Sequence, residues 1–191
     1  MGEAVQSRNG HDPRNRLPGM SRGTAVPGRA VLPPVPRIAA AILPVALATA
    51  IGSLSTGSNI EGWYETIQKP VFNPPNWVFP VAWTILYTMI AASLWRLLGA
   101  RPIAGPTGRA WWLALAAFFT QLALNAAWTP VFFAYHALGA GLIVALAMLV
   151  MVLWTIRLSW RFDHVAAWLL VPYAAWVAFA SLLNGLIWQM N

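Results

Sequence analysis

The sequence contains no cysteine and few charged residues. Among its 191 residues there is no Cys, and Asp, Glu, Lys and Arg together make up only 9%. Without cysteine the chain cannot form a disulfide, a thiolate nucleophile or a Cys-ligated metal site. The sequence also lacks a Ser/His/Asp arrangement, a phosphate-binding P-loop and a glycine-rich dinucleotide motif. The enzyme classes that depend on these groups are therefore excluded.

Hydrophobic residues dominate instead, at 59% of the chain, and they gather into five runs. Each run is close to the roughly 20 residues that cross a bilayer as a helix. Because only helices and closed barrels satisfy their own backbone in lipid, we predict an all-α integral membrane protein, a bundle of five transmembrane helices. The predicted membrane domain covers residues 38–191, with helices at about 38–55, 77–98, 110–128, 137–156 and 165–188.

The five runs contain no Asp, Glu, Lys or His, and their one arginine, Arg96, is near a run end. Proton-coupled transporters and ion channels usually keep an ionisable group at membrane depth, so both are disfavoured. The three histidines, His11, His136 and His164, lie outside the runs and have no metal-ligand spacing. We therefore predict no metal site and no axial haem ligand.

The basic residues predict the orientation in the membrane. Of the 12 Lys and Arg, all except Lys69 lie in the N-terminal segment, in or beside the second connection, or in the fourth connection. By the positive-inside rule the N-terminus is cytoplasmic and the C-terminus lies outside. The formal charge of +7 is thus interpreted as topological, with no nucleic acid as partner. We expect a bacterial cytoplasmic membrane as the location, although the sequence does not distinguish inner from outer membrane.

Residues 1–37 are rich in Gly, Pro and Arg and have no apolar period, so they predict a disordered basic tail. Three alternatives remain open. The basic start and the following run could form a signal peptide, or the scarcity of acids could indicate an organellar transit peptide. The true start could also be Met20.

The first connection, Thr56 to Asn76, is long and mixes charged with aromatic residues, as in "EGWYETIQKP". Such a segment is expected to lie at the membrane interface, where it could form a lid over the bundle. Pro70, Pro74 and Pro75 then prevent the lid from continuing as a helix and determine where the second span begins. We interpret this stretch as a rigid hinge.

Aromatic and amide side chains recur on single helix faces of three spans. Taken singly, each face fits ordinary bundle packing, with amides bonding across helices. Together they favour a pocket for a flat apolar ligand that carries a few polar atoms. The faces are Phe79, Trp83 and Tyr87 on the second span, Gln121, Asn125 and Trp128 on the third, and Tyr173, Trp176, Ala180 and Asn184 on the fifth.

Three long motifs resemble the translocator protein family, also called TspO or tryptophan-rich sensory proteins. They are "WYETIQKPVFNPPNWVFPVAWTILY", "QLALNAAWTPVFF" and "VPYAAWVAFASLLN", in family order and spacing. The resemblance implies a five-helix homodimer that binds porphyrins, sterols or synthetic aromatic ligands near the first loop. The implied pocket residues are Trp63 or Tyr64, Trp83, Asn125, Trp128 and Trp176. Some bacterial members of the family degrade porphyrin in light, and the resemblance to them implies that Trp83 and Trp176 would carry the catalytic role.

The chain also departs from the animal members of that family. Gly185 follows Asn184, and no Lys or Arg comes after it, which argues against cholesterol as natural ligand. The main hypothesis is a membrane receptor or carrier for porphyrin-like tetrapyrroles with a sensory role, in which porphyrin is a ligand and no cofactor is covalently bound. The alternatives are a light-dependent porphyrin-degrading enzyme, and a membrane scaffold or lipid or sterol carrier.

Small residues every four positions allow close helix approach, either within one subunit or between two. They are Ala137, Gly141 and Ala145 on the fourth span, and Ala110, Ala114, Ala123 and Ala127 on the third. The resemblance favours a homodimer that forms through the third span.

Overall fold

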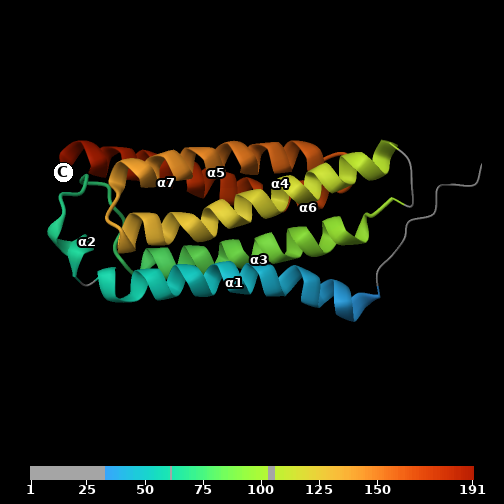
Figure 1. The fold of residues 1–191 in the computed structure, drawn as a ribbon, viewed down its shortest axis with the longest axis horizontal. Helices are drawn as coiled ribbons and strands as arrows, with labels where there is room; N and C mark the ends of the chain where they lie inside the picture. Colours follow the sequence, from blue (N-terminus) through green and yellow to red (C-terminus); the bar gives the residue numbers. More distant parts are fainter. Residues whose placement is uncertain (1–32, 61, 103–105) are drawn as a thin grey trace, which may run out of the picture.

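The computed structural model describes residues 33–60, 62–102 and 106–191, and it confirms an all-α bundle with five helical spans long and apolar enough to cross a membrane. The long helices lie side by side along one axis (Figure 1). They are α1 (Pro34–Ile60), α3 (Val78–Gly99), α4 (Pro106–Thr129), α5 (Leu138–Ser159) and α7 (Val171–Met190). The short helix α6 (His164–Leu169) precedes α7, and the four-residue α2 (Trp63–Thr66) lies between α1 and α3.

The first helix begins earlier and ends later than its apolar run predicts. α1 begins at Pro34, because proline has no N–H to leave unsatisfied in a first helical turn and its φ is already helical. Residues 34–37, which were predicted to belong to the tail, are therefore helical. The remainder of the predicted tail, residues 1–32, lies outside the described residues.

The regular α-helix is interrupted near a proline at two places, one just beyond the predicted third span and one inside the predicted fifth span. After α4 the chain continues as a π-helical turn, η1 (Pro130–Ala134), in which the Tyr135 N–H donates to the Pro130 carbonyl at 2.9 Å. The fifth span, predicted as one helix, is divided at Leu170, and Pro172 lies in the first turn of α7. Proline cannot supply the backbone N–H that an unbroken α-helix needs, which accounts for both interruptions.

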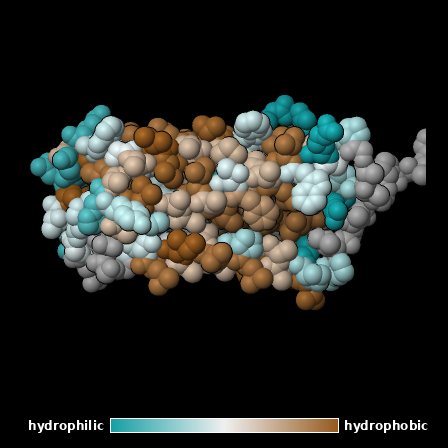
Figure 2. All heavy atoms as spheres, viewed as in Figure 1, coloured by the Kyte–Doolittle hydropathy of each residue, from teal (hydrophilic) through white to brown (hydrophobic). Residues whose placement is uncertain are grey.

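The surface agrees with a membrane environment. Figure 2 shows hydrophobic residues along the middle of the visible face, with hydrophilic residues gathered toward the two ends. Large apolar side chains on the outside, such as Leu54 and Ile143, are 83% and 70% exposed. In water such exposure would be unfavourable, whereas lipid tails solvate it.

Two clusters of buried side chains hold the bundle together. The larger cluster packs Ile90 and Leu94 of α3 against Phe118 of α4 and Tyr173 of α7. The smaller cluster joins Tyr64 of α2 to the end of α7. Both clusters combine residues from helices that are far apart in sequence, so neither forms until the helices associate.

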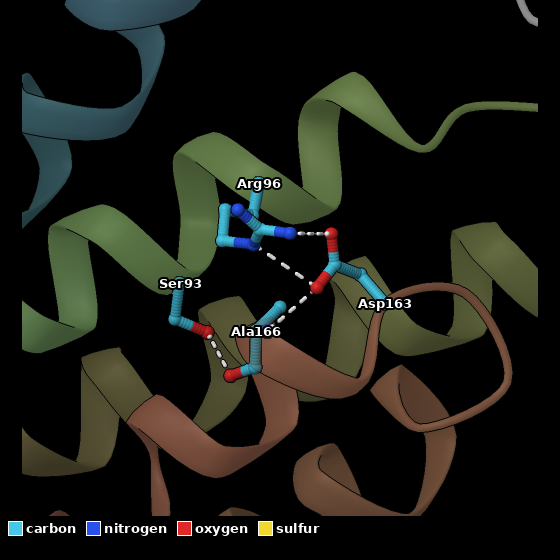
Figure 3. A network of polar contacts seen from close by, with 4 residues as sticks. All are labelled: Ser93, Arg96, Asp163 and Ala166. Atoms are coloured by element: carbon cyan, nitrogen blue, oxygen red, sulfur yellow. Dashed lines mark hydrogen bonds and ion pairs between the residues drawn. The ribbon is translucent and has the colours of Figure 1, made fainter.

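An ion pair ties α3 to the start of α6 (Figure 3). Arg96 donates from Nε to Asp163 Oδ1 at 3.0 Å, and its Nη2 lies 2.9 Å from Oδ2. Asp163 also caps α6 by accepting from the Ala166 N–H at 2.8 Å. Next to this pair, the Ser93 hydroxyl donates to the Ala166 carbonyl at 2.7 Å. The pair therefore holds the α5–α6 connection against α3.

Candidate functional site: an aromatic cavity under the first loop

A cavity of about 540 Å³ lies among α1, α3, α4, η1 and α7, at the end of the bundle where α2 and the C-terminus lie (Figure 1). Its volume is within the range of ordinary small-molecule sites. α3 and α7 make little direct contact with each other, and residues of both line the cavity. Within the described ranges, no charged side chain lines this cavity.

Rings from α3 and α7 form its apolar wall. The Trp83 ring lies 6.4 Å from that of Trp176 and is nearly perpendicular to it, and Phe79 meets Trp176 at 6.1 Å in a similar way. Trp83 also stacks on Tyr87 at 5.1 Å, because these residues are one turn apart on α3. Together these rings present an apolar aromatic surface to the cavity.

The opposite wall comes from the end of α4 and from η1. Trp128 stacks on Phe132 at 5.2 Å, and Phe133 meets Phe132 edge-on at 4.9 Å. The Trp128 Nε1–H donates to Asn184 Oδ1 at 3.3 Å, and Asn184 donates in turn to the Leu138 carbonyl at 2.8 Å. A π-helical turn widens the backbone and changes which residues face inward, so η1 brings two phenylalanines to one site.

α1 contributes a row of hydroxyls that the sequence interpretation missed. Thr49, Ser53 and Thr56 line the cavity together with Gly52. A Cβ on Gly52 would lie 3.5 Å from Thr129 Oγ1, an ordinary contact distance, so α1 faces the end of α4 directly at this position. Small and hydroxylated residues at helical spacing on an otherwise apolar helix were the signal that could have indicated this wall.

The first loop closes one end of the cavity. We call residues 62–76 the lid. Tyr64 is 4% exposed, and its hydroxyl donates to Asn73 Oδ1 at 2.9 Å, which ties the two ends of the lid together. Burial raises the pKa of Tyr64 to about 12, although the bond to Asn73 opposes the rise. The phenol therefore stays neutral and acts as a hydrogen-bond donor at physiological pH.

Further contacts hold the lid in place. Lys69 Nζ donates to the carbonyls of Tyr64 and Ile67, the latter at 3.0 Å, so its charge satisfies the end of α2. The Asn191 side chain accepts from the Gln68 N–H at 2.9 Å and donates to the Gln68 carbonyl at 3.0 Å. The lid is thus attached to the C-terminal end of α7.

Most of the predicted site residues line the cavity, but four do not. Those at the wall are Tyr64, Phe79, Trp83, Tyr87, Trp128, Trp176, Ala180 and Asn184. Trp63 instead stacks on the His136 ring at 4.1 Å and does not line the cavity. Gln121 and Asn125 of α4 and Tyr173 of α7 are instead buried inside the bundle.

These buried polar residues nevertheless reach the cavity through one hydroxyl. Tyr87 donates to Asn125 Oδ1 at 2.8 Å, Asn125 donates to the Tyr173 hydroxyl at 3.1 Å, and Tyr173 donates to Met148 Sδ at 3.2 Å. This series of hydrogen bonds fixes the Tyr87 hydroxyl at the wall. Gln121 is fully buried, and neither of its amide atoms has a partner.

The fold and this cavity define an integral membrane protein of the helical-bundle class, with an aromatic ligand-sized site under a loop. Residues 40–189 match the TspO/MBR family. The chain belongs to that family.

Several similar proteins show how far the likeness extends. "Tryptophan-rich protein TspO" of Archaeoglobus fulgidus is 37% identical over 158 residues, which is 81% of this chain and 97% of that protein. "Protein CrtK" of Rhodobacter capsulatus is 37% identical over 129 residues, 68% of this chain and 78% of the relative. "Translocator protein" of Bos taurus is 34% identical over 164 residues, which is 83% of this chain and 92% of that protein.

Proposed function

We propose that this chain is a membrane receptor or carrier that binds a porphyrin-like tetrapyrrole, or another flat apolar ligand, in the cavity and has a sensory or regulatory role. The observation that carries the proposal is the cavity of about 540 Å³ bounded by Trp83, Trp128 and Trp176. A protein of Cereibacter sphaeroides named "Tryptophan-rich sensory protein", 38% identical over 129 residues, supports the sensory role.

The polar atoms of the cavity favour a ligand with N–H donors. The hydroxyls of Thr49, Thr56 and Thr84 donate to carbonyls of their own helices, at 2.9, 2.7 and 2.8 Å. Each therefore presents its oxygen to the cavity as an acceptor. The pyrrole N–H groups of a metal-free tetrapyrrole match such acceptors. Its carboxylates would lie away from this uncharged wall, where water can solvate them.

A second candidate is an enzyme that oxidises bound porphyrin in light. The contact of Trp83 with Trp176 at 6.4 Å, and with Tyr87 at 5.1 Å, favours it. A photoexcited tetrapyrrole can lose an electron to dioxygen, and oxidisable rings in contact with each other can relay that electron, so the porphyrin is oxidised and dioxygen is reduced. Trp83 and Trp176 would carry this activity.

We also propose a homodimer that forms through α4. Ala116, Thr120, Ala123 and Ala127 make an exposed ridge of small residues on this helix. In contrast, Gly141 and Ala145 of α5 are buried within the subunit. Small exposed residues allow two helices to approach closely in lipid, and light scattering of the purified protein would test the dimer by its mass.

The deciding experiment is a titration of the detergent-solubilised protein with protoporphyrin, in the dark and then under light. We follow tryptophan quenching and the porphyrin absorption band. Trp83→Phe and Trp176→Phe should each weaken binding about tenfold, because each removes an indole that faces the ligand. Trp154→Phe is the matched control, since Trp154 is 57% exposed on the outer face of α5.

Saturable binding with stable absorption bands supports the receptor. Loss of the bands in light, abolished by both cavity substitutions and retained in Trp154→Phe, supports the enzyme. If micromolar porphyrin gives no saturable change, the tetrapyrrole proposal is wrong and a scaffold role gains support.

A further inference from the structure

The start of α1 lies at the end of the bundle opposite the lid (Figure 1). There Arg37 of α1 contacts Trp95 of α3. Its Cζ is 3.9 Å from the centre of the Trp95 ring. A Cβ built on Gly99 would come within 3.0 Å of the same Cζ and still closer to Nη1. Trp95 and Gly99 are one turn apart, so the guanidinium rests on both, and it has room because residue 99 has no side chain.

The N–H donors at this place have no acceptor. Arg37 Nε and Trp95 Nε1 are both buried, and neither has a hydrogen-bond partner. Among the described residues, only Asp163 forms an ion pair with an arginine, and that arginine is Arg96 and not Arg37. The Arg37 guanidinium, with its own Nε–H and the neighbouring indole N–H both lacking an acceptor, is electrostatically unfavourable. An anion at this place would supply the acceptor and balance the charge.

The depth of these residues in the membrane indicates which anion is available. Arg37 lies in the first turn of the span Pro34–Thr56, and Trp95 and Gly99 lie at the end of the span Val78–Gly99. The ends of an apolar span lie at the level of the lipid headgroups, where phosphate is the abundant anion. Tryptophan and arginine are both well suited to this interface.

We propose that Arg37, Trp95 and Gly99 form a binding site for the phosphate group of an anionic phospholipid, where the start of α1 meets the end of α3. Arg37 supplies the charge and charge-assisted hydrogen bonds. Trp95 supplies the ring on which the guanidinium rests and one further N–H donor. Gly99 has no side chain and so leaves room for the guanidinium. The site is separate from the cavity and does not depend on its ligand.

The test measures the unfolding temperature of the full chain in a non-ionic detergent, with added phosphatidylglycerol, phosphatidylcholine of the same acyl chains, or inorganic phosphate. A ligand that binds only the folded state raises this temperature in a saturable way. We expect phosphatidylglycerol alone to do so. Arg37→Gln should weaken the apparent affinity about tenfold or more, because the charge-assisted bonds are lost.

Two further variants separate a built site from general attraction. Gly99→Ala keeps every charge but displaces the guanidinium, so it should weaken phosphatidylglycerol binding as Arg37→Gln does. Arg157→Gln removes an exposed arginine at the end of α5, at the same end of the bundle, and should bind like the unchanged protein.

Three results would overturn the proposal. One is equal phosphatidylglycerol affinity in the unchanged protein and Arg37→Gln. Another is an equal loss in Arg157→Gln, which would indicate unspecific attraction to charge. The third is the same rise with inorganic phosphate alone, which would show that the lipid is not the source of the anion.

Discussion

At the scale of single residues, Asp163 combines two roles that mutation can separate. It pairs with Arg96 and caps α6. Burial acts to raise the pKa of Asp163, but the hydrogen bonds from Arg96 and from the Ala166 N–H, with the Arg96 charge, outweigh it, so the pKa lies below its ordinary 3.8. The folded state therefore holds the ionised carboxylate more strongly than the unfolded chain does.

We expect Asp163→Asn to cost about 1 kcal/mol of unfolding free energy at neutral pH, because asparagine still caps the helix but does not pair with Arg96. Asp163→Ala should cost about 1 kcal/mol more through loss of the cap. The contribution of the pair is complete above the unfolded pKa and declines as the pH falls through 3.8 and below. Thermal unfolding in detergent against pH checks this, and an identical acid profile for Asp163→Asn and the unchanged protein would contradict it.

At the scale of the helices, the packing of α5 against α7 and η1 leaves different space at two glycines. A Cβ on Gly141 would lie 3.0 Å from Asn184 Oδ1 and 3.3 Å from Phe132 Cδ2. A Cβ on Gly185 would meet only Leu142, at an ordinary 3.7 Å. The helices are thus in closest contact beside the cavity, where Asn184 also accepts from Trp128.

Gly141→Ala should therefore reduce the unfolding free energy by about 1 to 3 kcal/mol, as expected for overpacking. Gly185→Ala, its matched control at the same interface, should change it by less than about 0.5 kcal/mol. Unfolding temperatures of the two variants in the same detergent decide the point. A loss in Gly185→Ala as large as that in Gly141→Ala would mean that helix propensity or flexibility, and not packing, controls both positions.

At the scale of the whole molecule, the arginine-rich end and the lid lie at opposite ends of the bundle (Figure 1). The positive-inside rule predicts that the arginine-rich end lies in the cytoplasm and the lid outside. Because the chain has no cysteine, a single introduced thiol reports only its own position. Thr107→Cys and Gln189→Cys place a thiol at exposed positions of the two ends.

In intact cells a membrane-impermeant maleimide should label Gln189→Cys, and it should label Thr107→Cys only after permeabilisation. Labelling of Thr107→Cys alone in intact cells would show that the orientation is the opposite one. The lid, and the side from which a ligand enters under it, would then be cytoplasmic.

The aromatic wall was accessible from the sequence because its residues recur along single helices. Phe79, Trp83 and Tyr87 follow one another every four residues, so helical geometry alone brings them to one face. The row of hydroxyls on α1 was missed, since Thr49 and Ser53 are common in membrane helices and gain a role only from the helices they meet. Phe132 was missed as well, because the π-helical turn changes its direction.

Composition and hydrophobic runs by themselves predicted the five spans and the membrane environment, because both depend on local hydrophobicity. The resemblance to the family came from three motifs, each contiguous in the chain. Which residues face the cavity was decided only by the tertiary structure. Each face predicted on α4 and α7 is divided by the packing, with Asn125 and Tyr173 behind the wall and Trp128 and Trp176 at it. A sequence specifies the angle of a side chain around its own helix, whereas that helix's rotation against its neighbours follows from packing across the whole bundle.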